Sequence, residues 1–177
     1  GEPLLAHLKE PDIVKNGHRL VKQYNCQGCH QIANRGGQLV NIIGAPEYAP
    51  PNLNSEGRKA QPDGLLSFFN NPSIIRPNLQ VRMPSFHQIP DKEWNTIIRY
   101  FQYIDSEKIS YRGEFAFDNN STEYHAGEKL HELGACNNCH FYGETFPTQE
   151  ASTWAPNLAM MKERLNPEWV KEFLRDP

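Results

Sequence analysis

The pentapeptide Cys26-Gln27-Gly28-Cys29-His30 is the stretch of this sequence that decides its fold. A second copy, Cys136-Asn137-Asn138-Cys139-His140, begins 110 residues further along the chain. The two copies together contain all four cysteines of the protein. Each copy therefore places two thiols three positions apart, with a histidine directly after them.

This Cys-x-x-Cys-His pattern is the attachment signature of a c-type haem. Two thiols at this spacing project from one side of a helical turn and can form thioether bonds with the two vinyl groups of one haem. The histidine that follows is then held beneath the iron as its proximal ligand. We therefore expect two haem c groups, bound covalently through Cys26, Cys29, Cys136 and Cys139 and ligated axially by His30 and His140.

Three other uses of the four cysteines stay open on the sequence alone. A thiol–disulfide motif accounts for Cys-x-x-Cys, but it predicts neither the fused histidine nor a second copy. Four zinc ligands would have to come from two pairs that lie 110 positions apart, far beyond the usual spacing of a zinc ribbon. Structural disulfides are the third alternative. The fused histidine and the duplication favour haem over all three.

The duplication extends beyond the cysteine motifs. A glycine precedes each motif by nine residues, at Gly17 and Gly127, and a Pro-Asn-Leu triplet follows each motif. From the leucine of the triplet to a later proline is 19 residues in both halves of the chain. Only the loop between the motif and the triplet differs in length, and loops absorb such changes best. The sequence thus predicts two homologous modules, residues 1–105 and 123–177, joined by a linker over 106–122.

Helical periodicity before this linker predicts a long amphipathic helix. Apolar residues recur there at spacings of three and four, which is the signature of one buried helix face. The stripe consists of Trp94, Ile97, Ile98, Phe101 and Ile104. The preceding segment, residues 75–86, contains two prolines and is expected to be a loop.

These residues together resemble class I cytochrome c: Gly-x8-Cys-x-x-Cys-His, then Pro-Asn-Leu, then Arg-Met-Pro before a closing aromatic helix. The resemblance covers residues 10–104 and the first two thirds of the second module. It implies an all-α fold, with a small bundle of helices around each haem and a helix over 11–24 crossing a helix over 91–105. Gly17 would permit this close crossing, and an aromatic residue such as Tyr100 or Phe101 would pack there.

The resemblance also assigns residues to the haem pockets. Pro51 and Pro156 are expected to offer their carbonyls to the Nδ1–H groups of the proximal histidines, which fixes ring orientation and ligand basicity. Met83 is expected to be the distal ligand of the first haem. A thioether is a soft, neutral ligand, and histidine–methionine ligation raises the reduction potential.

Three residues near Met83 have alternative interpretations. Arg76 and Arg82 are candidates for pairing with the haem propionates, because a guanidinium suits carboxylates, and the alternative is a solvated surface charge for each. His87, four residues after Met83, is the rival distal ligand.

The second module has no counterpart of Met83 in this sequence. Met83 follows Pro72 by eleven residues, and the proline aligned with Pro72 is Pro177. We therefore expect a longer natural chain, with a matching methionine about eleven residues beyond Pro177. Met160 and Met161 align with residues that are not ligands in the first module, which favours packing roles. The alternatives are a recruited methionine ligand or a five-coordinate, reactive second haem.

Composition and charge exclude some classes of function. The chain has 177 residues and a formal net charge of −3, too close to balance to indicate nucleic-acid binding. No apolar run approaches the length of a transmembrane helix. A haem with both axial positions filled transfers electrons and does not bind substrate.

We therefore expect an extracytoplasmic, periplasmic dihaem cytochrome that passes single electrons between redox proteins. It would act as a free carrier or as a subunit of a membrane quinol-oxidising or other respiratory complex. The alternatives are a dihaem peroxidase with one reactive haem and a structural subunit of a haem wire.

Overall fold

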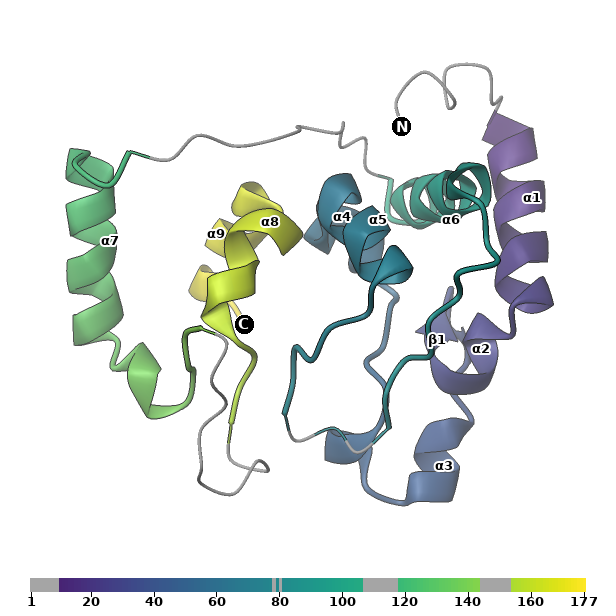
Figure 1. Ribbon diagram of the computed structural model, residues 1–177, viewed down its shortest axis with the longest axis horizontal. Helices are drawn as coiled ribbons and strands as arrows, with labels where there is room; N and C mark the ends of the chain where they lie inside the picture. The colour runs from purple at the N-terminus through teal and green to yellow at the C-terminus, as the bar shows by residue number, and fades with distance from the viewer. Residues whose placement is uncertain (1–9, 78, 80, 107–117, 144–153) are drawn as a thin grey trace.

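The computed structural model describes residues 10–77, 79, 81–106, 118–143 and 154–177. Over these residues the chain is mostly helical, with one two-stranded hairpin (Figure 1), in agreement with the expected all-α class. Residues 107–117, most of the expected linker, lie outside the described residues. None of the described helices is long and apolar enough to cross a membrane.

The first half of the chain contains both helices that the sequence predicts, each ending within one residue of its expected bounds. Its helices are α1 (Glu10–Gln23), α2 (Cys26–Cys29), α3 (Leu39–Ile43), the 3-10 turn η2 (Pro46–Tyr48), α4 (Glu56–Lys59), α5 (Pro62–Asn70) and α6 (Asp91–Ile104). A short antiparallel hairpin, β1 (Gln31–Ile32) and β2 (Arg35–Gly36), follows α2. The expected loop before α6 has no regular structure over its described residues.

Helix α1 crosses α6, and the two pack directly on each other (Figure 1). A Cβ atom at Gly17 would overlap the Cβ and ring of Tyr100, so the crossing requires glycine at this position. This confirms the expected partnership of Gly17 with an aromatic residue of the closing helix. The hydroxyl of Tyr24, just after α1, donates to the carboxylate of Glu93 at the start of α6 and ties the helices together again.

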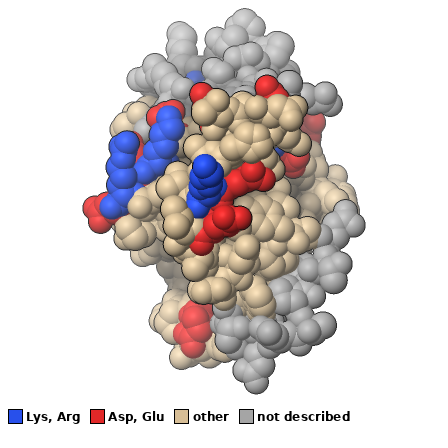
Figure 2. Space-filling model, turned by 90° about the vertical axis from the view of Figure 1, so that its left-hand side faces the viewer, with Lys and Arg blue, Asp and Glu red and all other residues tan. Residues whose placement is uncertain are grey.

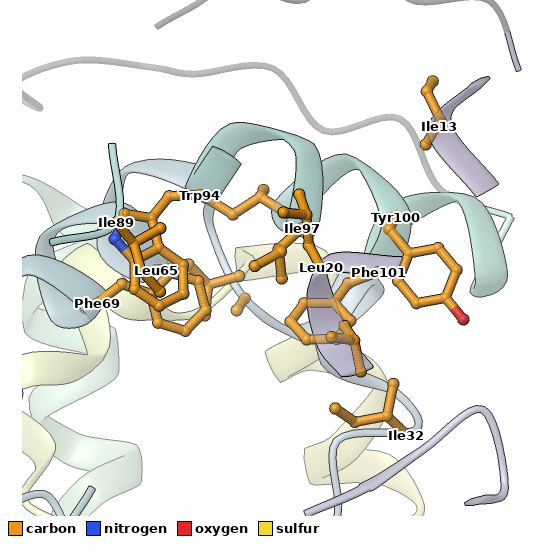
Figure 3. Packing of buried hydrophobic residues seen from close by; sticks show 13 residues of the cluster. Ile13, Leu20, Ile32, Leu65, Phe69, Ile89, Trp94, Ile97, Tyr100 and Phe101 are labelled. Atoms are coloured by element: carbon orange, nitrogen blue, oxygen red, sulfur yellow. The ribbon is translucent and has the colours of Figure 1, made fainter. Parts of the chain in front are cut away.

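Buried side chains of α1, α5 and α6 form the hydrophobic core of the first half (Figure 3). At one end the ring of Phe69 stacks on Trp94 with 4.3 Å between centroids, and Phe86 meets Trp94 edge-on at 6.0 Å. The predicted stripe of α6 is buried as far as Phe101, and Ile104 packs partly buried against it. Burying each large apolar side chain contributes about 1.5–3 kcal/mol, so this core contributes substantially to the stability of the first half.

The second half repeats the order of short helices found in the first. Its elements are α7 (Thr122–Leu133), the 3-10 turns η3 (Cys136–Asn138) and η5 (Leu158–Met160), α8 (Met161–Arg164) and α9 (Pro167–Arg175). Helices α8 and α9 have four and nine residues, the same lengths as α4 and α5. Proline begins both α5 and α9, at the positions that the sequence repeat aligns.

The halves differ in how their apolar faces are covered. Leu20 on α1 is 1% exposed, whereas its repeat counterpart on α7, Leu130, is 70% exposed. Phe69 on α5 is 7% exposed, whereas its counterpart on α9, Leu174, is 75% exposed. In the first half α6 covers both positions, and no described element of the second half takes the place of α6.

Candidate haem sites

The first Cys-x-x-Cys-His motif forms a single helical turn that starts from a left-handed residue. Asn25 has φ 52° and ψ 33°, a conformation that asparagine tolerates better than most residues, and α2 follows it. The backbone N–H of His30 donates to the carbonyl of Cys26 at 2.9 Å, which closes the turn. Cys26 and Cys29 therefore share one turn, with His30 extended directly beyond it.

The orientation of His30 is set by a hydrogen bond to the backbone. Its Nδ1 lies 2.8 Å from the carbonyl oxygen of Pro51, which can only accept, so Nδ1 carries the proton and donates. Nε2 is then the unprotonated nitrogen, with its lone pair available to a metal. Burial lowers the pKa of His30, so the ring stays neutral at physiological pH, which is the form that binds iron.

The pKa of the Cys26 thiol is shifted in the opposite direction to that of a catalytic thiol. Burial is the main cause that raises its pKa to about 11. Thiol–disulfide enzymes depend on a cysteine with a lowered pKa, because the thiolate is the nucleophile. The alternative of a thiol–disulfide motif is therefore disfavoured at this site.

The second motif repeats the geometry of the first. Ala135 is left-handed, with φ 50°, and the N–H of His140 donates to the carbonyl of Cys136 at 2.9 Å. Nδ1 of His140 lies 2.7 Å from the carbonyl oxygen of Pro156, so the same tautomer is selected. Two histidines, each just after a cysteine turn, thus present an unprotonated Nε2.

The asparagine of each Pro-Asn-Leu triplet stabilises the backbone next to the proline that binds the histidine, a role that the sequence analysis did not assign. In the second half the Asn157 side chain donates to the carbonyl of Gly143 at 2.8 Å and accepts from the N–H of Ala159 at 3.0 Å. Asn52 in the first half makes the matching acceptor bond to the N–H of Asn54 at 2.8 Å. The presence of asparagine at the same position of both triplets could have indicated this structural role from the sequence.

The loop that carries Met83 is braced by Arg82. Its guanidinium donates to the carbonyls of Arg76 and Pro77, at 3.1 and 3.3 Å. Arg82 therefore has a structural partner in the loop itself, while propionate pairing by Arg76 or Arg82 stays a prediction. Met83 is partly buried and packs against the hydrophobic core, whereas the rival ligand His87 is exposed.

The methionines of the second half occupy a different place. Met160 ends η5 and Met161 begins α8, whose counterpart α4 begins at Glu56 in the first half. Neither methionine lies in a loop equivalent to residues 75–86. The distal ligand of the second site remains a prediction.

The zinc and disulfide alternatives have no counterpart in the described residues, which include all four cysteines. Each cysteine is a free thiol, and no three His, Cys, Asp or Glu side chains among the described residues are grouped to hold a metal ion. The donor set at each motif is instead two thiols on one turn and one imidazole that is oriented by a proline carbonyl. That set fits covalent attachment of a haem and proximal ligation of its iron.

Comparison with known proteins agrees with this donor set. The model of the family described as cytochrome c oxidase, cbb3-type, subunit III matches residues 12–101, just over half of the chain. The matched segment contains most of α1, the first cysteine motif, Met83 and most of α6. No curated protein and no solved structure matches the chain.

Proposed function

The chain belongs to the family of cytochrome c oxidase, cbb3-type, subunit III, and on this basis we propose that it is a dihaem cytochrome c. It passes single electrons between redox partners through one haem in each half of the chain. The observation that carries the proposal is the repeated histidine–proline hydrogen bond, His30 to Pro51 and His140 to Pro156, beside two Cys-x-x-Cys turns. A single cytochrome domain is expected to have one such site. The second site, at His140, lies outside the residues that match the family model, and it is the basis for proposing a second haem.

When bound, haem c supplies a one-electron couple at its iron. The residues of the chain hold and tune it. The four cysteines would hold the haems covalently, and the two proline carbonyls orient the imidazoles and would raise their basicity as ligands. The apolar side chains around Trp94 would exclude water from the first site, and Met83 would supply it with a soft, neutral donor.

We further propose that the protein works outside the cytoplasm, with redox proteins of a respiratory oxidase as its partners. Support comes from the family itself and from the chemistry of thioether attachment, which the resemblance to bacterial class I cytochromes places beyond the inner membrane. A subunit of a membrane complex and a free carrier are both compatible with the described helices.

The mass of the denatured holoprotein tests the number of haems. We expect the polypeptide plus two haems, because thioether bonds survive denaturation. The double substitution Cys136→Ser with Cys139→Ser should leave one haem attached, and Cys26→Ser with Cys29→Ser should leave the other. A wild-type mass of one haem, unchanged when Cys136 and Cys139 are replaced, would refute the dihaem proposal and leave a single cytochrome domain.

A further inference from the structure

The two halves of the chain meet through equivalent surfaces. Ala60, between α4 and α5, forms an antiparallel β-bridge with Leu165, which occupies the same place between α8 and α9. Helix α5 packs on α8, and α4 packs on α9, so each contact is the image of the other (Figure 1). A contact in which the same patch serves on both sides is isologous and implies an approximate two-fold axis at the bridge.

The backbone hydrogen bonds across this contact obey the same symmetry. The N–H of Gln61 donates to the carbonyl of Arg164 at 2.8 Å. The N–H of Asn166, the repeat counterpart of Gln61, donates to the carbonyl of Lys59, the counterpart of Arg164, also at 2.8 Å. Two reciprocal bonds of equal length fix both the register and the angle of the contact.

Side chains reinforce these bonds. Gln61 is 8% exposed, and its Nε2 donates to the carbonyls of Lys162 and Leu165 at 2.8 and 2.6 Å. Asn166 donates through Nδ2 to the carbonyl of Arg58 at 3.1 Å. Because these carbonyls lie at the ends of four-residue helices, they would otherwise lack partners within the helix.

Two cation–π contacts and one glycine also contribute to the interface between the halves. The ammonium of Lys59 lies 5.5 Å from the ring centroid of Trp169, and the guanidinium of its counterpart Arg164 lies 6.0 Å from that of Phe68. A Cβ atom at Gly64 would overlap the carbonyl oxygen of Glu163, so the close approach of α5 to α8 depends on glycine. These contacts make the two surfaces complementary to each other.

A further backbone hydrogen bond joins a segment next to each candidate haem site. The N–H of Asn157 donates to the carbonyl of Ile75 at 3.2 Å. Ile75 begins the loop that carries Met83, and Asn157 follows Pro156, the acceptor for His140. The distal loop of the first site thus touches the proximal triplet of the second.

We propose that this interface is a lock that holds the two haem modules in one fixed, approximately two-fold orientation, with Gln61 as its positioning residue. The two sites then behave as one redox unit instead of two independently tumbling cytochromes. This inference rests on the proposed function for the presence of two haems, but the lock itself is a property of the chain.

The test uses the full-length holoprotein and the variant Gln61→Ala. Amide hydrogen exchange at Gln61 and Asn166 should become about tenfold faster, because the alanine removes two side-chain hydrogen bonds from the interface. The exciton couplet in the Soret circular dichroism, which depends on the mutual orientation of the two haems, should lose most of its amplitude. Gln61→Asn should restore part of both signals, since asparagine occupies the equivalent position at residue 166.

Matched variants separate the lock from general effects of substitution. Gln88→Ala replaces an exposed glutamine outside the interface and should change neither signal. Gly64→Ala should act like Gln61→Ala by forcing α5 away from α8. If the amide hydrogen-exchange rates and the Soret couplet are unchanged in both Gln61→Ala and Gly64→Ala, the proposal that this interface fixes the two modules is wrong. A protein carrying a single haem would refute the proposed function instead, and hydrogen exchange would still decide the lock.

Discussion

Gly17 on α1 lies against Tyr100 on α6 so closely that no Cβ atom fits between them. Among the described residues, its repeat counterpart Gly127 on α7 has no heavy atom from outside the neighbouring helix backbone within 4 Å of the place where a Cβ would stand. The same residue thus serves a tight helix crossing in one half and meets no described neighbour of this kind in the other. This difference gives a substitution and its control within one chain.

Gly17→Ala is expected to destabilise the first half by about 1–3 kcal/mol, the usual cost of overpacking a core. This cost exceeds the gain of up to about 1 kcal/mol that alanine brings to a helix interior. Denaturant unfolding of the holoprotein, followed by tryptophan fluorescence, measures the change. Gly127→Ala should be neutral or stabilising, and equal losses from the two substitutions would contradict the crossing.

Much of the first half could be predicted from its sequence, because its elements carry long-range patterns. The apolar stripe of α6 predicts a long helix, which has 14 residues in the structure, and the family resemblance predicts the contact of His30 with Pro51. The family resemblance also predicted that Gly17 meets an aromatic residue of the closing helix, but it left Tyr100 and Phe101 as alternatives, and the structure selects Tyr100.

The interface between the halves could not be predicted in this way. Helices α4 and α8 have only four residues, too few to show a periodicity. Their contacts use backbone carbonyls, which any residue supplies, so no residue type marks them. Gln61 has no special signal in sequence, and Arg82 was considered for propionates while the structure uses it to brace its own loop.

Asp105 predicts how stability depends on pH. Its carboxylate ends α6 and accepts the N–H groups of Gly57 and Arg58, at 2.8 and 3.2 Å. Burial raises the pKa of this carboxyl above its ordinary value of 3.8, although the two N–H groups act in the opposite direction. The folded protein therefore binds more protons than the unfolded chain just above pH 3.8, and the contribution of Asp105 to stability falls as the pH rises through this window.

Asp105→Asn keeps an acceptor oxygen for both N–H groups and removes the ionisation. The free energy of unfolding of the variant, relative to wild type, should therefore rise between about pH 4 and pH 6 and then level off. Urea titrations at several pH values measure this difference. Asp12→Asn, at an exposed position on α1, controls for the loss of one carboxylate. A difference that falls with pH would show that the two N–H bonds outweigh burial.

Electrostatic steering by this protein should be weak. The chain carries a formal net charge of −3, and four ionised propionates on two reduced haems would bring it to about −7. On the face shown in Figure 2, Lys and Arg lie among Asp and Glu, and no large field of one sign is present. Association with a cationic redox partner should slow modestly with added salt, because the Debye length near physiological salt is about 8–10 Å. Stopped-flow reduction at several ionic strengths checks this, and acceleration by salt would contradict it.

Met83 gives the prediction that bears most directly on electron transfer. If its sulfur is the distal ligand of the first haem, Met83→Leu should abolish the first site's share of the sulfur-to-iron charge-transfer band. The reduction potential of that haem should fall, because water or a stronger donor replaces a neutral thioether that favours the ferrous state. Leucine is chosen because Met83 also packs on the core, and a leucine of similar volume costs less than about 1.5 kcal/mol of stability.

His87→Ala is the matched control for the ligand assignment, because His87 is exposed and lies four residues from Met83 in the same part of the chain. The substitution should leave the band and both potentials unchanged. If instead the first haem lacks the band in the wild type, and its spectrum and potential change in His87→Ala but not in Met83→Leu, the distal ligand is His87, because histidine–histidine ligation gives no sulfur-to-iron charge transfer. The measurement is a redox titration followed in the visible spectrum. It uses a protein that also carries Cys136→Ser and Cys139→Ser, because these substitutions remove the second haem and leave the signal of the first. On that background a fall in potential confined to Met83→Leu is the expected outcome, since the thioether of Met83 is the soft donor proposed for this site.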